Sequence, residues 1–151
     1  MTLSVERRKP LTANVGIFGV GLDVYWRQFP ELKATLVSCL DAFVRQVQAE
    51  GVRAINFGMV DNAHTAYGLL PRLKAAELDL VFVDMLTYAT SATFGILIRE
   101  LDVPVVLVAL QPLRRLDYEH ATIEMQLKND NICSLPEFAG VAVRMGKRVP
   151  P

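Results

Sequence analysis

The sequence predicts an open, doubly wound α/β domain, with a mostly parallel sheet of about four to five strands and helices on both faces. Apolar segments rich in β-branched residues alternate with amphipathic segments along the chain, and parallel strands require such crossover connections. The length of 151 residues is typical of one domain, and 52% hydrophobic residues are enough for one buried core. Together these features predict a fold of the Rossmann-like or flavodoxin-like class.

The two ends of the chain are expected to lie outside this domain. Residues 1–13 are mostly polar and predict a flexible lead-in, and residues 148–151 predict a loose tail. The alternating pattern fills residues 14–147. We therefore expect a single α/β domain over that range.

The first strand and helix follow this lead-in. Val15–Leu22 is rich in β-branched residues and glycine and predicts a strand. Pro30 and Glu31 suit the first turn of a helix. From Leu32 the apolar residues recur with a spacing of roughly 3.6. Gly51 is a good C-terminal cap, so the helix is expected to end there.

Two further helices connect three further strands, which we expect at Val52–Val60, Leu80–Leu86 and Val105–Leu110. Asp61 or Asn62 can cap the first of these helices, whose buried face would hold Leu69, Leu70, Leu73 and Leu78. The second helix is expected at Ala92–Leu101. Because the last strand is nearly all apolar, it is expected in the middle of the sheet, covered on both sides. Later helices are expected near His120–Lys128 and Pro136–Met145.

Composition argues against several classes of function. Sixteen basic and sixteen acidic residues cancel, so no long-range field attracts nucleic acid. The longest apolar run, Val103–Leu110, is far shorter than a bilayer-spanning helix. Cys39 and Cys133 lie far apart, and the N-terminus lacks the apolar core of a signal peptide. We therefore expect a cytoplasmic protein without a disulfide framework, with neither nucleic acid nor membrane as a partner.

Motifs for nucleotide, metal and covalent chemistry are weak. Gly16, Gly19 and Gly21 do not have the dinucleotide-loop spacing, and no Walker pattern is present. The carboxylate of Glu124 follows His120 by four residues, a pair that is more typical of a solvated helix face than of a metal site. No serine or cysteine has a recognisable nucleophile motif. The sequence thus predicts no catalytic residue and no metal ligand in this chain.

Aromatic, amide and hydroxyl side chains gather where the strands end. In a parallel sheet these segments share the carboxyl edge, where ligands bind. Aromatic rings pack against the C–H face of a sugar, and amides and carboxylates bond its hydroxyls. The expected sugar-facing residues are Asp23, Tyr25, Trp26, Tyr88, Thr90 and Gln111. The same side chains could instead serve as caps or partner contacts, and Tyr88 is the best single candidate for a ligand contact.

The order of several short segments resembles a known family. These segments are GVGLDVYWRQFPE from Gly19, GMVD from Gly58, DMLTYATS from Asp84, LQP from Leu110 with LDY after it, and SLPEFAGV from Ser134 before RMG. As a series they resemble the N-terminal domain of the L-fucose/L-arabinose isomerase family over Asn14–Gly146. The resemblance implies aldose–ketose isomerisation, assisted by a divalent metal that is usually manganese, in an oligomeric multi-domain enzyme.

The resemblance also implies that this chain is catalytically incomplete, because the family's metal-binding and catalytic residues lie in later domains. The expected partners are an aldose or ketose sugar, the missing C-terminal domains or a subunit that carries them, and further copies of the chain. Tyr88 resembles the family's pocket aromatic, Tyr25 falls in its first-strand loop, and Asp130 or Asn131 lies near a family amide position. Two alternatives are a stand-alone sugar-binding or regulatory module and a purely structural assembly domain.

Overall fold

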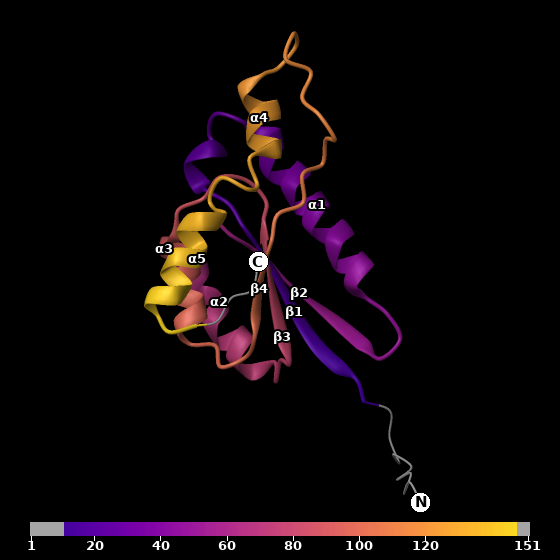
Figure 1. Ribbon diagram of the computed structural model, residues 1–151, viewed down its shortest axis with the longest axis vertical. Helices are drawn as coiled ribbons and strands as arrows, with labels where there is room; N and C mark the ends of the chain where they lie inside the picture. Colours follow the sequence, from indigo (N-terminus) through magenta and orange to yellow (C-terminus); the bar gives the residue numbers. More distant parts are fainter. Residues whose placement is uncertain (1–10, 148–151) are drawn as a thin grey trace, which may run out of the picture.

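The computed structural model describes residues 11–147 and shows one parallel sheet (Figure 1). Its strand order is β2-β1-β3-β4, and every pairing is parallel. The strands are β1 (Ala13–Val20), β2 (Val52–Val60), β3 (Leu80–Met85) and β4 (Val105–Val108). The predicted α/β class is confirmed. The expected lead-in lies outside the described residues except for residues 11–13, and the expected tail lies wholly outside them.

Five helices cover the two faces of the sheet within the described residues: α1 (Pro30–Val47), α2 (Ala63–Ala75), α3 (Ser91–Arg99), α4 (Ile123–Asn129) and α5 (Leu135–Arg144). Figure 1 shows α2, α3 and α5 on one side, and α1 and α4 pack together on the other. A single 3-10 turn, η1 (Asp23–Tyr25), precedes α1. In this part of the chain no helix combines the length and apolar character needed to cross a bilayer.

Side-chain spacing explains how the helices dock on the sheet. Leu32, Leu36 and Leu40 lie four residues apart, so they form one stripe on α1 that is buried against β1. On the other face, the rings of Phe94 on α3 and Phe138 on α5 pack together with their centroids 4.7 Å apart. Burial of these two apolar layers stabilises the sheet between them.

A capping box fixes the start of α2. The side chain of Asn62 accepts from the backbone N–H of Thr65 at 2.9 Å, and the Thr65 hydroxyl accepts from the backbone N–H of Asn62 at 3.2 Å. Of the two predicted caps, Asn62 is therefore the one used. Asp61 is left free for a different set of contacts.

Two glycines of β1 make room for neighbouring side chains. A Cβ at Gly16 would lie 2.7 Å from the Leu78 side chain, and a Cβ at Gly19 would overlap Leu86. Both positions thus let a leucine side chain lie directly on the strand backbone. The glycine-rich run needs no bound phosphate to explain it.

The expectation that the fourth strand lies in the middle of the sheet is wrong. β4 pairs only with β3 and forms an edge of the sheet built by residues 11–147. Val105 and Leu107 are buried against the α3 side, whereas Val106 and Val108 are only half-buried on the α1 side. Because α1 packs on β1 and β2, it covers the outer strand only in part, and an apolar strand can occupy this edge.

Candidate functional site

All four strands end at one edge of the sheet, and the segments that follow them form the candidate site. Figure 1 shows η1, α4 and the β4–α4 connection, residues 109–122, gathered at this end of the molecule. Such an edge is where open α/β sheets bind their ligands. The predicted sugar-facing residues divide there into separate groups.

Asp61 organises the first group, at the end of β2. Its carboxylate is 3% exposed and accepts hydrogen bonds from Trp26 Nε1 at 2.7 Å, Lys33 Nζ at 2.8 Å and Thr65 Oγ1 at 3.1 Å. Burial raises the pKa of Asp61, but the hydrogen bonds from Lys33 and Trp26 outweigh it, so the pKa lies below its usual value. The Trp26 indole N–H is therefore already bonded within the protein.

The exposed Asp23 lies close to this network. Its carboxylate accepts a hydrogen bond from Asn62 Nδ2 at 3.1 Å, and its backbone N–H donates to the Asp61 carbonyl at 3.1 Å. These bonds tie η1 to the start of α2. Asp23 therefore joins the first and second connections rather than standing free at the edge.

Tyr25 and Tyr88 form the second group, together with residues of the α4–α5 loop. The pKa of the Tyr25 phenol is raised by burial and by its neighbours Tyr88, Asp130 and Cys133. The Tyr25 ring also meets the Trp26 ring edge-on at 6.4 Å between centroids. Two half-buried phenols from separate connections and the Asp130 carboxylate are thus near enough for their charges to interact.

Cys133 does not give this group a nucleophile. Burial and the side chain of Asp130 raise the pKa of the Cys133 thiol to about 11, and the thiol also donates to the Asp130 carbonyl at 3.4 Å. The thiol is therefore protonated at neutral pH, and the thiolate is the reactive form of cysteine.

The two remaining predicted residues make other contacts. Thr90 is the exposed N-cap of α3, and its side chain makes no capping hydrogen bond. The side chain of Gln111 donates to the Asn129 carbonyl at 2.9 Å and holds the β4–α4 connection against α4. Gln111 therefore positions the wall of a cavity that the sequence did not reveal.

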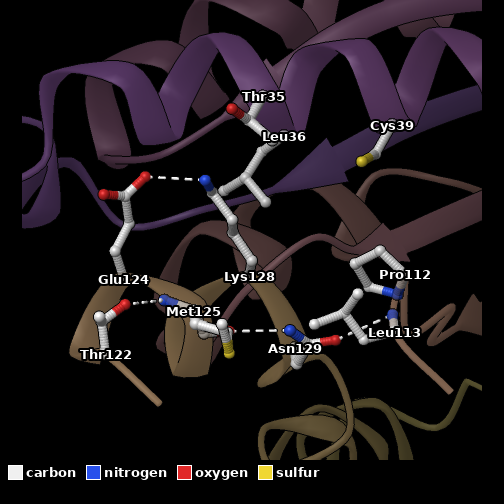
Figure 2. Close-up of a pocket in the computed structure, with 10 residues that line it drawn as sticks. All are labelled: Thr35, Leu36, Cys39, Pro112, Leu113, Thr122, Glu124, Met125, Lys128 and Asn129. Atoms are coloured by element: carbon white, nitrogen blue, oxygen red, sulfur yellow. Dashed lines mark hydrogen bonds and ion pairs between the residues drawn. The ribbon is translucent and has the colours of Figure 1, made fainter. Parts of the chain in front are cut away.

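This cavity lies between α1, α4 and the β4–α4 connection and has two parts. The larger part, here called the chamber, has a volume of about 330 Å³, and most of its lining surface is apolar, from side chains such as Leu36, Leu113 and Met125 (Figure 2). The smaller part, the recess, has a volume of about 30 Å³ and includes Asp84 and Asn131 in its lining. Leu36, Cys39, Pro112 and Lys128 line both parts.

Two acceptors in the recess lack hydrogen-bond partners. Asn131 Nδ2 donates to the carbonyls of Met85 at 2.7 Å and Leu86 at 3.0 Å, which leaves its buried Oδ1 without a partner. Asp84 is 3% exposed, its Oδ1 has no partner, and burial raises its pKa to about 7. Burying a polar atom without a hydrogen bond costs free energy, so a ligand that donates hydrogen bonds to these two oxygens would bind favourably in the recess.

The metal-ligating side chains of residues 11–147 do not gather in one place. Across residues 11–147 no three His, Cys, Asp or Glu side chains are grouped so that they could hold an ion. The His120 ring contacts Asp117 Oδ2 at 2.8 Å, while Glu124 pairs with Lys128 at 2.8 Å. His120 and Glu124 therefore use different partners.

Exposed apolar side chains gather on the β4–α4 connection and the first turn of α4. The most exposed are Tyr118 at 85% and Ile123 at 67%, with Leu110 and Leu113 also exposed. Trp26 and Phe29, in the β1–α1 connection, are half-buried against the α1 core. The β4–α4 connection and the first turn of α4 therefore offer an apolar surface to a partner.

No family model matches the sequence, and no curated protein matches it. The interpretation of the edge therefore comes from its own residues. Its most informative features are the Tyr25–Tyr88 group and the unpartnered acceptors of the recess.

Proposed function

We propose that this chain is the sugar-contacting and assembly domain of an aldose–ketose isomerase similar to the L-fucose/L-arabinose isomerase family. The observation that carries the proposal is that Tyr25 and Tyr88, from two separate connections, and Asp130 are near enough at the carboxyl edge for their charges to interact. An aromatic ring can cover the C–H face of a sugar, and the phenol hydroxyl can reach a ring or hydroxyl oxygen. A carboxylate can accept from the sugar's hydroxyl groups.

In this proposal the chain binds and orients the sugar but does not move the protons. The raised pKa of Tyr25 keeps its phenol protonated, so that Tyr25 donates to a sugar oxygen rather than acting as a base. Another domain or subunit supplies the divalent metal and the acid and base groups. The exposed apolar side chains of Leu113, Tyr118 and Ile123 offer that partner a surface beside the sugar site.

Titration with L-arabinose and L-fucose, followed by NMR of the backbone amides, tests the sugar contact. We expect shifts at Tyr25, Tyr88 and Asp130, and we expect Tyr88→Ala to remove them. Tyr67→Ala is the matched control, because Tyr67 is an exposed tyrosine on α2. Shifts elsewhere only, or shifts that Tyr88→Ala leaves unchanged, would contradict the proposal.

An activity assay tests the division of labour. The chain alone, supplied with manganese and either aldose, should show no turnover above a blank that contains only the metal. In the completed enzyme, Tyr88→Ala should raise KM more than it lowers kcat, because a contact made equally in ground and transition states contributes uniform binding. Sustained turnover by the chain alone would show that its own residues suffice.

A further inference from the structure

We infer that the recess and chamber form a binding site for a protonated primary amine that carries a small apolar body. Asp84 and Asn131 would hold the ammonium group in the recess, and the chamber would hold the body. This site lies on the α1 side of β3 and uses none of the side chains assigned to the sugar contact, so it does not rest on the proposed function.

No hydrogen-bond donor of the lining reaches the free acceptors of Asp84 and Asn131. Asp84 Oδ1 has no hydrogen-bond partner, and the N–H groups of the Asn131 amide donate to the carbonyls of Met85 and Leu86. The buried Oδ1 atoms of Asp84 and Asn131 therefore both call for an N–H or O–H donor. A primary ammonium has three donors in a compact group, and it makes charge-assisted bonds with a carboxylate. A volume of about 30 Å³ suits a head group of this size.

The charges around the recess favour a cation. Lys128 Nζ is paired with Glu124 Oε1 at 2.8 Å, so α4 contributes no net charge at the mouth (Figure 2). On α1, burial and the nearby Asp84 raise the pKa of the Cys39 thiol, which stays neutral. No titratable group of the β4–α4 connection lines either part. The ionised Asp84 is therefore the only unbalanced charge of the lining.

The chamber selects an apolar body. Leu36, Leu113 and Met125 present hydrocarbon and thioether surface, and the polar groups of the wall are largely used within the protein. Thr122 Oγ1 accepts from the Met125 N–H at 3.1 Å, and the Asn129 side chain bonds Met125 and Leu113. A polyhydroxylated body would bury hydroxyl groups without partners here, whereas an aryl or alkyl body would not. About 330 Å³ is within the usual range for small-molecule sites.

Affinity for such an amine should depend on pH through Asp84. The pKa of Asp84 is about 7 without a ligand, and the carboxylate is the form that binds an ammonium. The ionised fraction rises about tenfold from pH 6 to pH 8, and apparent affinity follows the population of the competent form. A primary amine remains protonated over most of this range. Binding should therefore tighten about tenfold as the pH rises.

The test is calorimetry on the full chain with benzylamine and, as the neutral isostere, benzyl alcohol. We expect benzylamine to bind at pH 8, about tenfold more weakly at pH 6, and benzyl alcohol to bind at least about tenfold more weakly than benzylamine. Asp84→Asn should weaken benzylamine by at least about tenfold. Asp102→Asn, a fully exposed carboxylate in the α3–β4 connection, is the matched control and should change nothing.

A second variant separates loss of the site from loss of the fold. Leu113 is 43% exposed, so Leu113→Trp should leave the fold intact while filling the chamber, and it should abolish benzylamine binding. Equal binding of the alcohol and the amine, full affinity in Asp84→Asn, or no saturable binding of benzylamine to the unmodified chain would each overturn the inference. The last result would indicate that ordered water alone occupies the recess.

Discussion

Asp84→Asn should make the protein more stable at neutral pH, although it alters a buried side chain of the sheet. Burial raises the pKa of Asp84 from 3.8 to about 7, so the folded state holds a proton that the unfolded chain has released. The free energy of unfolding therefore has its full value below the pKa of Asp84 in the unfolded chain, and it decreases as the pH rises toward the pKa of Asp84 in the folded state. Since one pKa unit corresponds to about 1.4 kcal/mol, the cost reaches about 4 kcal/mol at pH 8.

The measurement is urea denaturation at pH 4 and pH 8, followed by the fluorescence of Trp26, the chain's single tryptophan. At pH 4 both side chains are neutral, and the two proteins should unfold at similar urea concentrations. At pH 8 the asparagine variant should be more stable by about 4 kcal/mol. Subtracting one protein from the other removes the titration of all other groups. A difference that does not change between the two pH values would refute the reasoning.

The other predictions concern stability and assembly. Asp61→Ala leaves half-buried donors without their acceptor and should cost about 3 kcal/mol in urea denaturation, whereas a loss under about 1 kcal/mol would contradict the network. Because its partners lower the pKa of Asp61, its stabilisation is present above about pH 4 and is lost as the pH falls further, which acid unfolding of Asp61→Asn would check. Gly19→Ala should lower stability by about 1–3 kcal/mol, because the new Cβ overlaps Leu86. Gly68→Ala is the control: it has open space on α2 and should raise stability by up to about 1 kcal/mol. An equal effect of the two variants in thermal melts would refute the packing role of Gly19. Ile123→Asp should shift sedimentation toward monomer if the exposed α4 surface mediates association, and an unchanged profile would exclude that surface.

Much of the fold could be predicted because local patterns and tertiary packing agree. The strand Val52–Val60 is found with its predicted limits, and the spacing of the α1 leucines identifies its buried stripe. The end of α1 differs from the prediction: the helix stops at Val47 rather than at Gly51. Gln48 adopts an extended backbone there, and its side chain bonds the backbone of Val52 and Ala54 at 2.6 and 3.0 Å. That contact joins separate elements, so helical periodicity cannot reveal it.

The candidate site could be predicted only in part, for a related reason. Residues that follow strands were expected at one edge, and Tyr25 and Tyr88 do lie near one another there. The sequence did not indicate that Trp26 would be bonded to Asp61, or that Asn131 would turn its amide toward the end of β3. The sequence does single out Asp84, because it is the only charged residue in an otherwise apolar strand. Its importance depends on the absence of a nearby donor, which only the folded arrangement shows.

The strand order also constrains how the chain can fold. β1 lies inside the sheet, where Val15 pairs with Ala54 on one side and with Leu80 on the other. The pairing of β1 with β2 can form once β2 is available. The pairing of β1 with β3 must wait for a segment 65 residues away from Val15, and because this loop is longer, it closes more slowly. During that interval an apolar strand has an open edge. Nascent chains that stop before β3 should therefore be prone to aggregate, and the step that ends this exposure is the arrival of β3.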